Sequence, residues 1–290
     1  AYLLQPSTFG SAPIFLLTTN LNENDEQSRS ISYKLYDSNE ATRIAQSIIL
    51  GIGGAMLIDK LGLNIDIYHM NEGHSLPLNF YLYSKYQSLA EVKKRVIFTT
   101  HTPEAAGNEE HRYALLKEMS FFYPLQDHEV KHILNLEGDS LNYTVAALKF
   151  AKKANGVSKM HAEVAREMWK GNPGICDIVD ITNAQNKTYW KDDELEKALA
   201  NNDDKAITTR KKEMKRQLFK VVADQCGKIF DENVLTIVWA RRFAGYKRAD
   251  LMMRDWDRFI NLVFNSDYPV QVIWAGKPYP EDYGAIEQFN

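Results

Sequence analysis

The stretch VLTIVWARRFAGYKRAD, residues 234–250, decides the fold class of this chain. Its first seven residues are apolar and rich in β-branched side chains, a pattern that predicts a buried strand. Four cations follow within eight positions, around a glycine: Arg241, Arg242, Lys247 and Arg248. Ligands of α/β proteins bind where strands end, and fixed cations at such an edge suit a phosphate. The alternative is a solvated run of charges after a core strand.

A second apolar run, Val270 to Ala275, follows a helical stretch from Lys247 to Phe264. Strand, helix and strand in this order predict a β-α-β unit with parallel pairing and a right-handed crossover. The fold class expected from this unit is α/β.

Further strands upstream also end in polar residues. Ile65 to Met70 runs into the turn residues Asn71, Glu72 and His74, and Val96 to Thr100 runs into His101. Polar groups gathered at strand ends predict one side of a cleft. The plainer interpretation is that each caps the next helix, and a lone His74 is more often structural than catalytic.

Three other segments carry expectations for the fold. Ala41 to Leu61 has helical spacing, and its glycines at 51–54 favour close helix packing over a phosphate-binding loop. Its apolar core, residues 44–58, is shorter than a membrane span, so we expect a core helix. Residues 141–153 read as a helix that ends in a turn at Asn155 and Gly156, with Ser158 capping the helix that follows.

Composition places the chain among soluble globular proteins. It has 290 residues, of which 44% are hydrophobic and 25% charged, and its net charge is −3. The length predicts about two domains, and the near-balanced charge does not indicate a nucleic-acid or membrane partner. Two cysteines, neither in a metal-type spacing, and the lack of a signal peptide favour a reducing, cytoplasmic location. A basic cluster at 210–216 fits the solvated face of an amphipathic helix better than a nucleic-acid site.

We expect three segments along the chain. Residues 1–204 would form part of an N-terminal Rossmann-like domain, 205–231 a connecting helix, and 232–290 the start of a second Rossmann-like domain. Two strands are too few for a stable half of such a fold. The chain begins without a methionine and stops just after a strand and turn, which suggests a piece of a longer protein.

Five motifs together resemble the α-glucan (glycogen, starch and maltodextrin) phosphorylases, in the short bacterial and archaeal branch. They occur in the family's order at YHMNEGHS (68–75), VIFTTHTPEAAGNE (96–109), ANGVSKMHAEVAREMW (154–169), VWARRFAGYKRADL (238–251) and VIWAGKPYP (272–280). The resemblance implies a GT-B architecture of two Rossmann-like domains. It also implies reversible phosphorolysis of α-1,4-glucans to glucose 1-phosphate, with retention of configuration. The implied enzyme is cytoplasmic, and an oligomer is compatible with the resemblance.

The resemblance also assigns roles to residues of this chain. His101 matches the histidine beside the reacting glucosyl residue, and Asn155 an asparagine that binds the same sugar. Arg242 and Lys247 match the pair that holds the substrate and cofactor phosphates, and Arg241 stands where a lysine often contacts the cofactor phosphate. The residues that match polar groups of the glucan cleft are Asn71, Glu72 and His74.

The implied cofactor is pyridoxal 5'-phosphate, which this family uses through its phosphate as a proton donor or acceptor. Nothing in residues 232–290 matches the lysine that attaches it. The chain also has Ala184, Gln185 and Asn186 where the family usually has Gly-Val-His, and Met56 where an arginine is usual. These departures indicate an inactive internal fragment. They leave two alternatives, a nucleotide-sugar glycosyltransferase of GT-B architecture and a non-catalytic glucan-binding relative.

Overall fold

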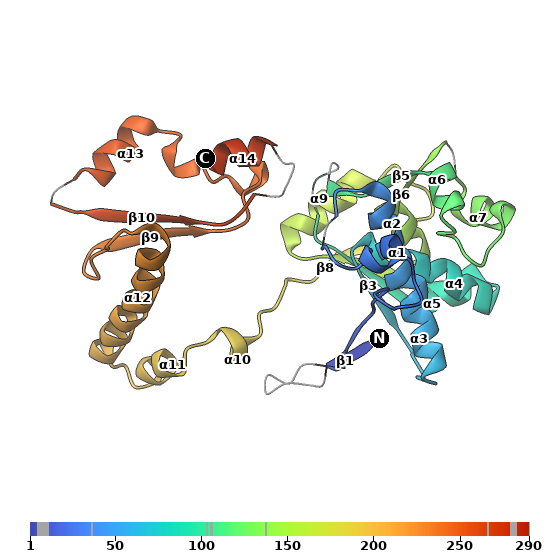
Figure 1. Cartoon of the computed structure of the whole chain (residues 1–290), viewed down its shortest axis with the longest axis horizontal. Helices are drawn as coiled ribbons and strands as arrows, with labels where there is room; N and C mark the ends of the chain where they lie inside the picture. The colour runs from blue at the N-terminus through green and yellow to red at the C-terminus, as the bar shows by residue number, and fades with distance from the viewer. Residues whose placement is uncertain are drawn as a thin grey trace. The chain divides into compact units, whose positions relative to one another are not determined.

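The computed structural model describes residues 1–4, 12–35, 37–102, 104, 107–136, 138–265, 267–278 and 283–289. Its chain divides into two units, Ala1–Gln185 and Asn186–Asn290 (Figure 1). Each contains parallel strands with helices between them, so the expected α/β class is confirmed. Pro103, Ala105 and Ala106 of the motif at 96–109 lie outside the described residues, as does the Tyr-Pro end of the motif at 272–280.

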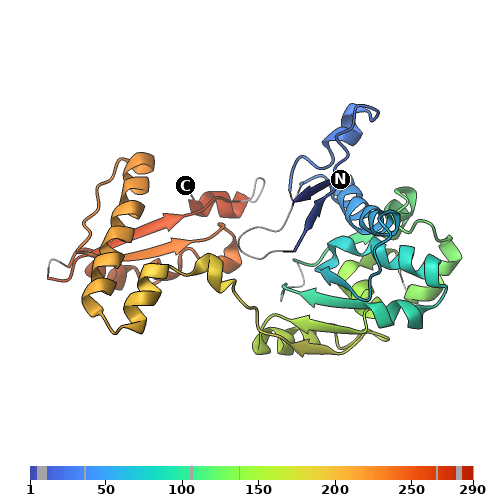
Figure 2. The same cartoon turned by 90° about the horizontal axis from the view of Figure 1, so that it is seen from below.

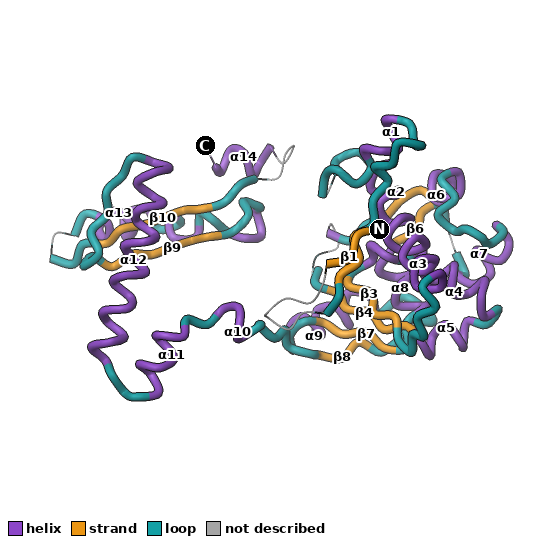
Figure 3. The backbone as a smooth tube through the Cα atoms, turned by 60° about the horizontal axis from the view of Figure 1, so that its bottom comes forward, coloured by secondary structure: helices purple, strands orange, loops and turns teal. Residues whose placement is uncertain are grey.

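The centre of unit 1 is a parallel sheet with strand order β3-β4-β7-β8, whose strands lie side by side in Figure 3. The strands are β3 (Tyr68–Asn71), β4 (Val96–Thr100), β7 (Lys153–Gly156) and β8 (Ile178–Asp180). The helices of this unit are α1 (Glu26–Ser30), α2 (Glu40–Ile48), α3 (Gly54–Lys60), α4 (Pro77–Tyr86), α5 (Leu89–Arg95), α6 (Tyr113–Glu118), α7 (Asp127–Leu134), α8 (Tyr143–Phe150) and α9 (Lys159–Trp169). Fully buried Met70, Phe80, Phe98, Leu116 and Phe150 belong to one continuous core.

Residues 141–153 do not form the single helix that we expected. The structure has β6 (Ser140–Asn142), then α8, then β7, so Asn155 and Gly156 lie in a strand and not in a turn. β7 pairs with β4 on one side and β8 on the other. Backbone pairing in the middle of a sheet overrides the local turn preference of an Asn-Gly dipeptide.

The predicted helix at 41–61 is present as α2, a π-helical turn η1 (Ile49–Gly53) and α3. It was wrong to treat this segment as too short for a membrane: in the described part of the chain, Glu40–Lys60 is the one helix long and apolar enough to cross one, by length and composition alone. Its buried residues Ile44, Ile52 and Ala55 lie within unit 1. A side chain on Gly51 would meet the Leu78 nitrogen at 2.7 Å, which confirms close packing there.

Two small antiparallel pairs complete unit 1. β5 (Glu110–Arg112) pairs with β6, and β1 (Tyr2–Leu4) pairs with β2 (Ile14–Leu16). The apolar run from Pro13 to Thr19 predicts a buried strand, but all three residues of β2 are exposed. A two-stranded ribbon has only its own partner to pack against, so its apolar side chains remain accessible.

Unit 2 contains the predicted β-α-β unit. β9 (Leu235–Ala240) and β10 (Val270–Ala275) pair in parallel with α13 (Trp256–Val263) between them, and the two orange arrows point the same way in Figure 2. Its other helices are α10 (Lys187–Trp190), α11 (Asp193–Ala200), α12 (Asp204–Cys226) and α14 (Tyr283–Phe289). Its buried core is small, with Phe243, Ala249 and Ala285 packed against two tryptophans.

The boundary between the units falls nearer the N-terminus than the expected position at residue 204. α11 packs on α12, and the Arg210 guanidinium bonds the Asp192 carboxylate with Nη2 at 2.8 Å from Oδ2. In the basic cluster, Arg216 pairs with Glu232 and the Lys215 ammonium donates to the Val234 carbonyl. These bonds tie the connecting helix to unit 2.

Candidate functional site

Polar side chains meet at the carboxyl edge of the sheet of unit 1. The parallel register places Asn71 opposite Thr99, and Thr99 opposite Asn155. Glu72 and His101 directly follow β3 and β4. Strand β7, which we had not predicted, is what brings Asn155 beside these residues. The edge is therefore built by three adjacent strands.

Glu72 is the central acceptor of this edge. Its carboxylate accepts hydrogen bonds from the backbone N–H of His101 and from the Thr102 hydroxyl, the latter at 3.1 Å. Its backbone has φ of 61°, a conformation that costs energy for any residue except glycine. The next residue, Gly73, lies so close to Tyr143 that a side chain would reach its Cβ at 2.8 Å. This packing holds Glu72 in its strained conformation.

A chain of hydrogen bonds fixes the Asn155 side chain. The Thr99 hydroxyl donates to Asn155 Oδ1 at 2.7 Å, and His69 Nε2 lies 2.7 Å from the same hydroxyl. Because that hydroxyl proton is committed to Asn155, His69 Nε2 is the donor in this pair. No sequence pattern selects His69 or Thr99, since their roles arise only from strand register.

His161 is a second residue that sequence reasoning missed. It lies in the first turn of α9, where the predicted cap Ser158 bonds its backbone N–H at 3.1 Å. Its Nδ1 accepts the Val157 N–H at 3.0 Å, while its buried Nε2 has no hydrogen-bond partner among the described residues. Burial lowers the pKa of His161, and this effect outweighs the negative charge of Glu72, which would raise it. The sequence signal that could have identified His161 is its position three residues after the predicted helix cap Ser158, where its backbone N–H meets the cap.

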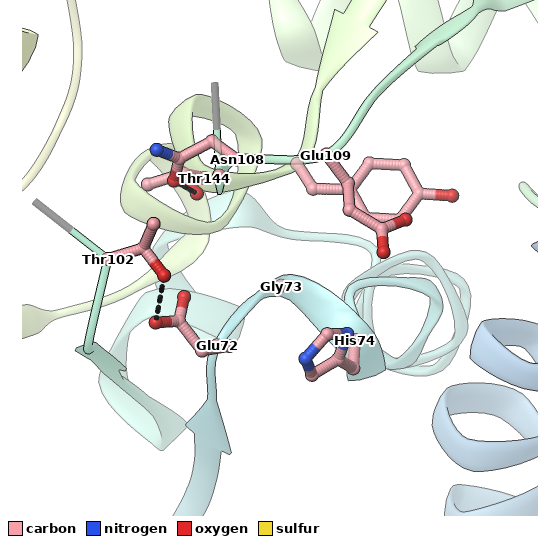
Figure 4. A pocket seen from close by; sticks show the side chains of 9 residues that line it. Glu72, Gly73, His74, Thr102, Asn108, Glu109 and Thr144 are labelled. Atoms are coloured by element: carbon pink, nitrogen blue, oxygen red, sulfur yellow. Dashed lines mark hydrogen bonds between the residues drawn. The ribbon is translucent and has the colours of Figure 1, made fainter. Parts of the chain in front are cut away.

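A pocket opens beside this edge (Figure 4). It is lined by Glu72, Gly73, His74, Thr102, Gly107, Asn108, Glu109, Tyr143 and Thr144. Its walls offer two carboxylates, hydroxyls and an amide, groups that bond to the hydroxyls of a polar ligand. The structure brings Glu72 and His74 into this pocket, whereas Asn71 is exposed and His101 and Asn155 do not line it.

A buried histidine and a partly exposed arginine lie beside Glu109. His111 Nε2 lies 3.0 Å from Glu109 Oε2, and Arg43 Nε lies 3.9 Å from Glu109 Oε1. Burial alone would raise the pKa of Glu109, but the hydrogen bond with His111 and the charge of Arg43 outweigh it and lower that pKa. The Glu109 carboxylate is therefore ionised at neutral pH. It is another site residue absent from our sequence-based assignments.

The cations of the second candidate site follow β9 in unit 2. Arg242 Nη2 donates to the Tyr246 hydroxyl at 3.2 Å, and Lys247 Nζ lies 4.7 Å from the centre of the same ring. Burial would raise the pKa of Tyr246, but the Arg242 hydrogen bond and the Lys247 charge lower it instead. Tyr246 thus contacts both predicted phosphate ligands, Arg242 and Lys247. The sequence-based assignments did not include it.

Arg241 is held by its backbone. The Arg241 N–H donates to the Ala275 carbonyl at 3.0 Å. Gly276 packs against the Arg241 carbonyl so closely that it leaves no room for a side chain at position 276. Within the described ranges, Arg241, Arg242 and Lys247 form no ion pair with a carboxylate. These three cations at a strand end, with no carboxylate partner in the described part of the chain, provide the charge that an anion requires.

Comparison with known proteins identifies relatives of the whole chain. No family model matches it. An uncharacterised protein of Methanocaldococcus jannaschii is 46% identical over all of this chain and 54% of its own length. The maltodextrin phosphorylase of Thermococcus litoralis is 31% identical over 96% of this chain and 39% of its own length.

The glycogen phosphorylase of Aquifex aeolicus is also 31% identical, over 94% of this chain and 47% of its own length. The chain thus spans about half the length, or less, of the curated relatives it matches. Similarity that extends along nearly the entire chain fits the order of the five motifs. The chain is a homologue of the glycogen and maltodextrin phosphorylases, corresponding to a part of these enzymes.

Proposed function

We propose that this chain is part of an α-glucan phosphorylase whose complete protein converts α-1,4-glucan and phosphate reversibly into glucose 1-phosphate, with retention of configuration. The observation that carries the proposal is the bond from the His101 backbone N–H to the Glu72 carboxylate. It joins two of the five motifs at the carboxyl edge of a parallel sheet, where α/β proteins bind their ligands. The GT-B architecture and a cytoplasmic location are part of the proposal.

Unit 1 would bind the glucan. The roles assigned to His101 and Asn155 are contacts to the reacting glucosyl residue, and those of Asn71, Glu72 and His74 are contacts to the cleft. Asn155 fits because Thr99 occupies its Oδ1 and orients its amide. Glu72 and His74 fit because they line a pocket rich in hydrogen-bonding groups.

Unit 2 would hold the phosphates. Arg242 and Lys247 would clamp the substrate phosphate, and Arg241 with Lys247 the phosphate of pyridoxal 5'-phosphate. The residues present fit such a group, because these cations lack carboxylate partners among the described residues. When bound, the cofactor phosphate supplies a proton donor and acceptor. The cations would offset the repulsion between two anionic groups.

An assay of the complete protein tests the proposal. With pyridoxal 5'-phosphate, maltodextrin and inorganic phosphate, we expect release of glucose 1-phosphate that depends on phosphate. Absence of turnover would contradict the proposal. In the reverse direction, glucose 1-phosphate should extend a maltodextrin primer, whereas preference for UDP-glucose or ADP-glucose would identify a nucleotide-sugar glycosyltransferase. We expect no turnover from the 290-residue chain alone.

A further inference from the structure

His111 is the middle residue of β5, and both nitrogens of its ring face carboxylates. Nδ1 lies 2.7 Å from Glu40 Oε1, and Nε2 lies 3.0 Å from Glu109 Oε2. The His111 side chain is 2% exposed. A neutral imidazole has one nitrogen that can only accept a hydrogen bond, which an ionised carboxylate cannot donate. The two bonds together therefore require an imidazolium, with one N–H for each carboxylate.

The charges around His111 balance. Glu40 and Glu109 are the two anions, and Arg43 is a second cation that lies 3.9 Å from Glu109. His74 adds a weaker positive influence on Glu109, and the Tyr143 ring centre lies 5.1 Å from that of His111. Loss of the His111 proton would leave an excess negative charge in a poorly solvated place, which is costly.

Glu109 connects this network to the pocket. Its backbone carbonyl accepts the Tyr143 N–H at 2.9 Å, and the Thr144 hydroxyl donates to Asn108 at 2.6 Å. These bonds anchor the backbone to the start of α8, while His111 and Arg43 act on the carboxylate. Figure 4 shows the Glu109 side chain at the pocket with Glu72 and His74.

We propose that His111 is a positioning residue for the pocket. As an imidazolium between Glu40 and Glu109, it orients the Glu109 carboxylate at the pocket wall, ready to accept hydrogen bonds from saccharide hydroxyls. The saccharide as ligand rests on the proposed function. The charge state of His111 does not. Raising the pH through the folded-state pKa of His111 then weakens saccharide binding. The neutral ring has a single N–H for two carboxylates, so Glu109 loses the charge-assisted bond that orients it.

NMR titration of the ring protons in the 290-residue chain tests the charge state. We expect His111 to stay protonated to a higher pH than the exposed His128, which serves as internal control. Glu40→Gln removes one carboxylate that is half exposed, and should lower the midpoint of His111. A His111 ring that is neutral at pH 6, or that titrates with His128, would overturn the proposal.

Calorimetric titration with maltoheptaose at two pH values, below and above the measured midpoint of His111, tests the positioning. We expect wild-type affinity to fall by about tenfold at the higher pH, the value of one charge-assisted hydrogen bond. His111→Gln should bind weakly at both pH values, whereas His128→Gln should behave as wild type.

Glu40→Gln should move the pH dependence of binding to lower pH, and it supplies the same test if His111→Gln does not fold. Affinity that is independent of pH in the wild type, with unchanged binding by the folded variants, would overturn the positioning role. Failure of the wild-type chain to bind maltoheptaose at either pH would contradict both the glucan-binding role of unit 1 and the saccharide part of this inference. The NMR titration decides the charge state of His111 in either case.

Discussion

At the scale of single residues, Glu72 shows how strain and polarity coincide at the candidate site. Its backbone lies in the left-handed region, and its carboxylate joins the ends of β3 and β4 through His101 and Thr102. Strained residues persist only where their surroundings fix them, which is typical of functional sites. Sequence alone selected Glu72 and His101, because both follow apolar strands, but it did not reveal the bond between them.

Arg242→Ala is the variant that tests the phosphate clamp in the complete protein. Arg242 is exposed and bonds to Tyr246, so its loss should leave the fold intact. We expect kcat/KM for phosphorolysis to fall by an amount equivalent to about 2–4 kcal/mol of transition-state stabilisation. Arg258→Ala, an exposed arginine on α13, is the matched control and should keep wild-type activity. Equal rates for the two variants would refute the clamp.

At the scale of elements, the helix from Glu40 to Lys60 shows why a glycine can persist inside a helix. Gly51 faces the turn before α4, where the Leu78 nitrogen and the Ser75 carbonyl leave no room for a side chain. Gly54, three residues later, has nothing within 4 Å. The sequence pattern predicted close packing for the whole glycine cluster, but only the structure separates the glycine that needs it from the one that does not.

Gly51→Ala and Gly54→Ala should therefore change stability in opposite directions. We expect Gly51→Ala to lower the free energy of unfolding by about 1–3 kcal/mol, because the new methyl group overlaps backbone atoms of the neighbouring turn. Gly54→Ala should raise it by up to about 1 kcal/mol through better helix propensity. Urea denaturation followed by circular dichroism measures both. A stabilising Gly51→Ala would contradict the packing described here.

The bonds of His111 to α2 and to Glu109 predict a pH window of stability. The pKa of His111 is raised from its ordinary value of 6.5, because its bonds to two carboxylates outweigh the effect of burial. Its contribution is thus complete below pH 6.5 and is lost as pH rises through the folded-state pKa. The pKa of Glu109 is lowered from 4.5, so its contribution is complete above that pH and is lost on acidification.

Unfolding measured from pH 3 to 9 should therefore show a maximal contribution of this pair between about pH 4.5 and 6.5. The decline above that window should be smaller in His111→Gln than in the wild type. The exposed variant His128→Gln should keep the full decline. A His111→Gln profile parallel to that of the wild type at alkaline pH would show that His111 is not the linked group.

At the scale of the whole molecule, the chain consists of two units whose residues follow one another without interleaving. All residues from Ile181 to Trp190 are exposed. Exposed backbone with few tertiary contacts is where proteases cut first. We therefore expect limited trypsin digestion to cleave first after Lys187 or Lys191, giving two fragments that mass spectrometry can identify. Initial cleavage inside α12, despite its many lysines and arginines, would contradict this division.

By itself, the sequence determined the α/β class, the β-α-β unit of residues 235–275 and the residues that follow strand ends. These features depend on periodicity and chain order, which a sequence carries locally. Only the tertiary structure decided that Asn155 lies in a strand beside Thr99, that Glu109 joins the pocket, and that His111 bonds to both Glu40 and Glu109. The reason is that these contacts join residues far apart in the chain, through strand register and burial that no local pattern encodes.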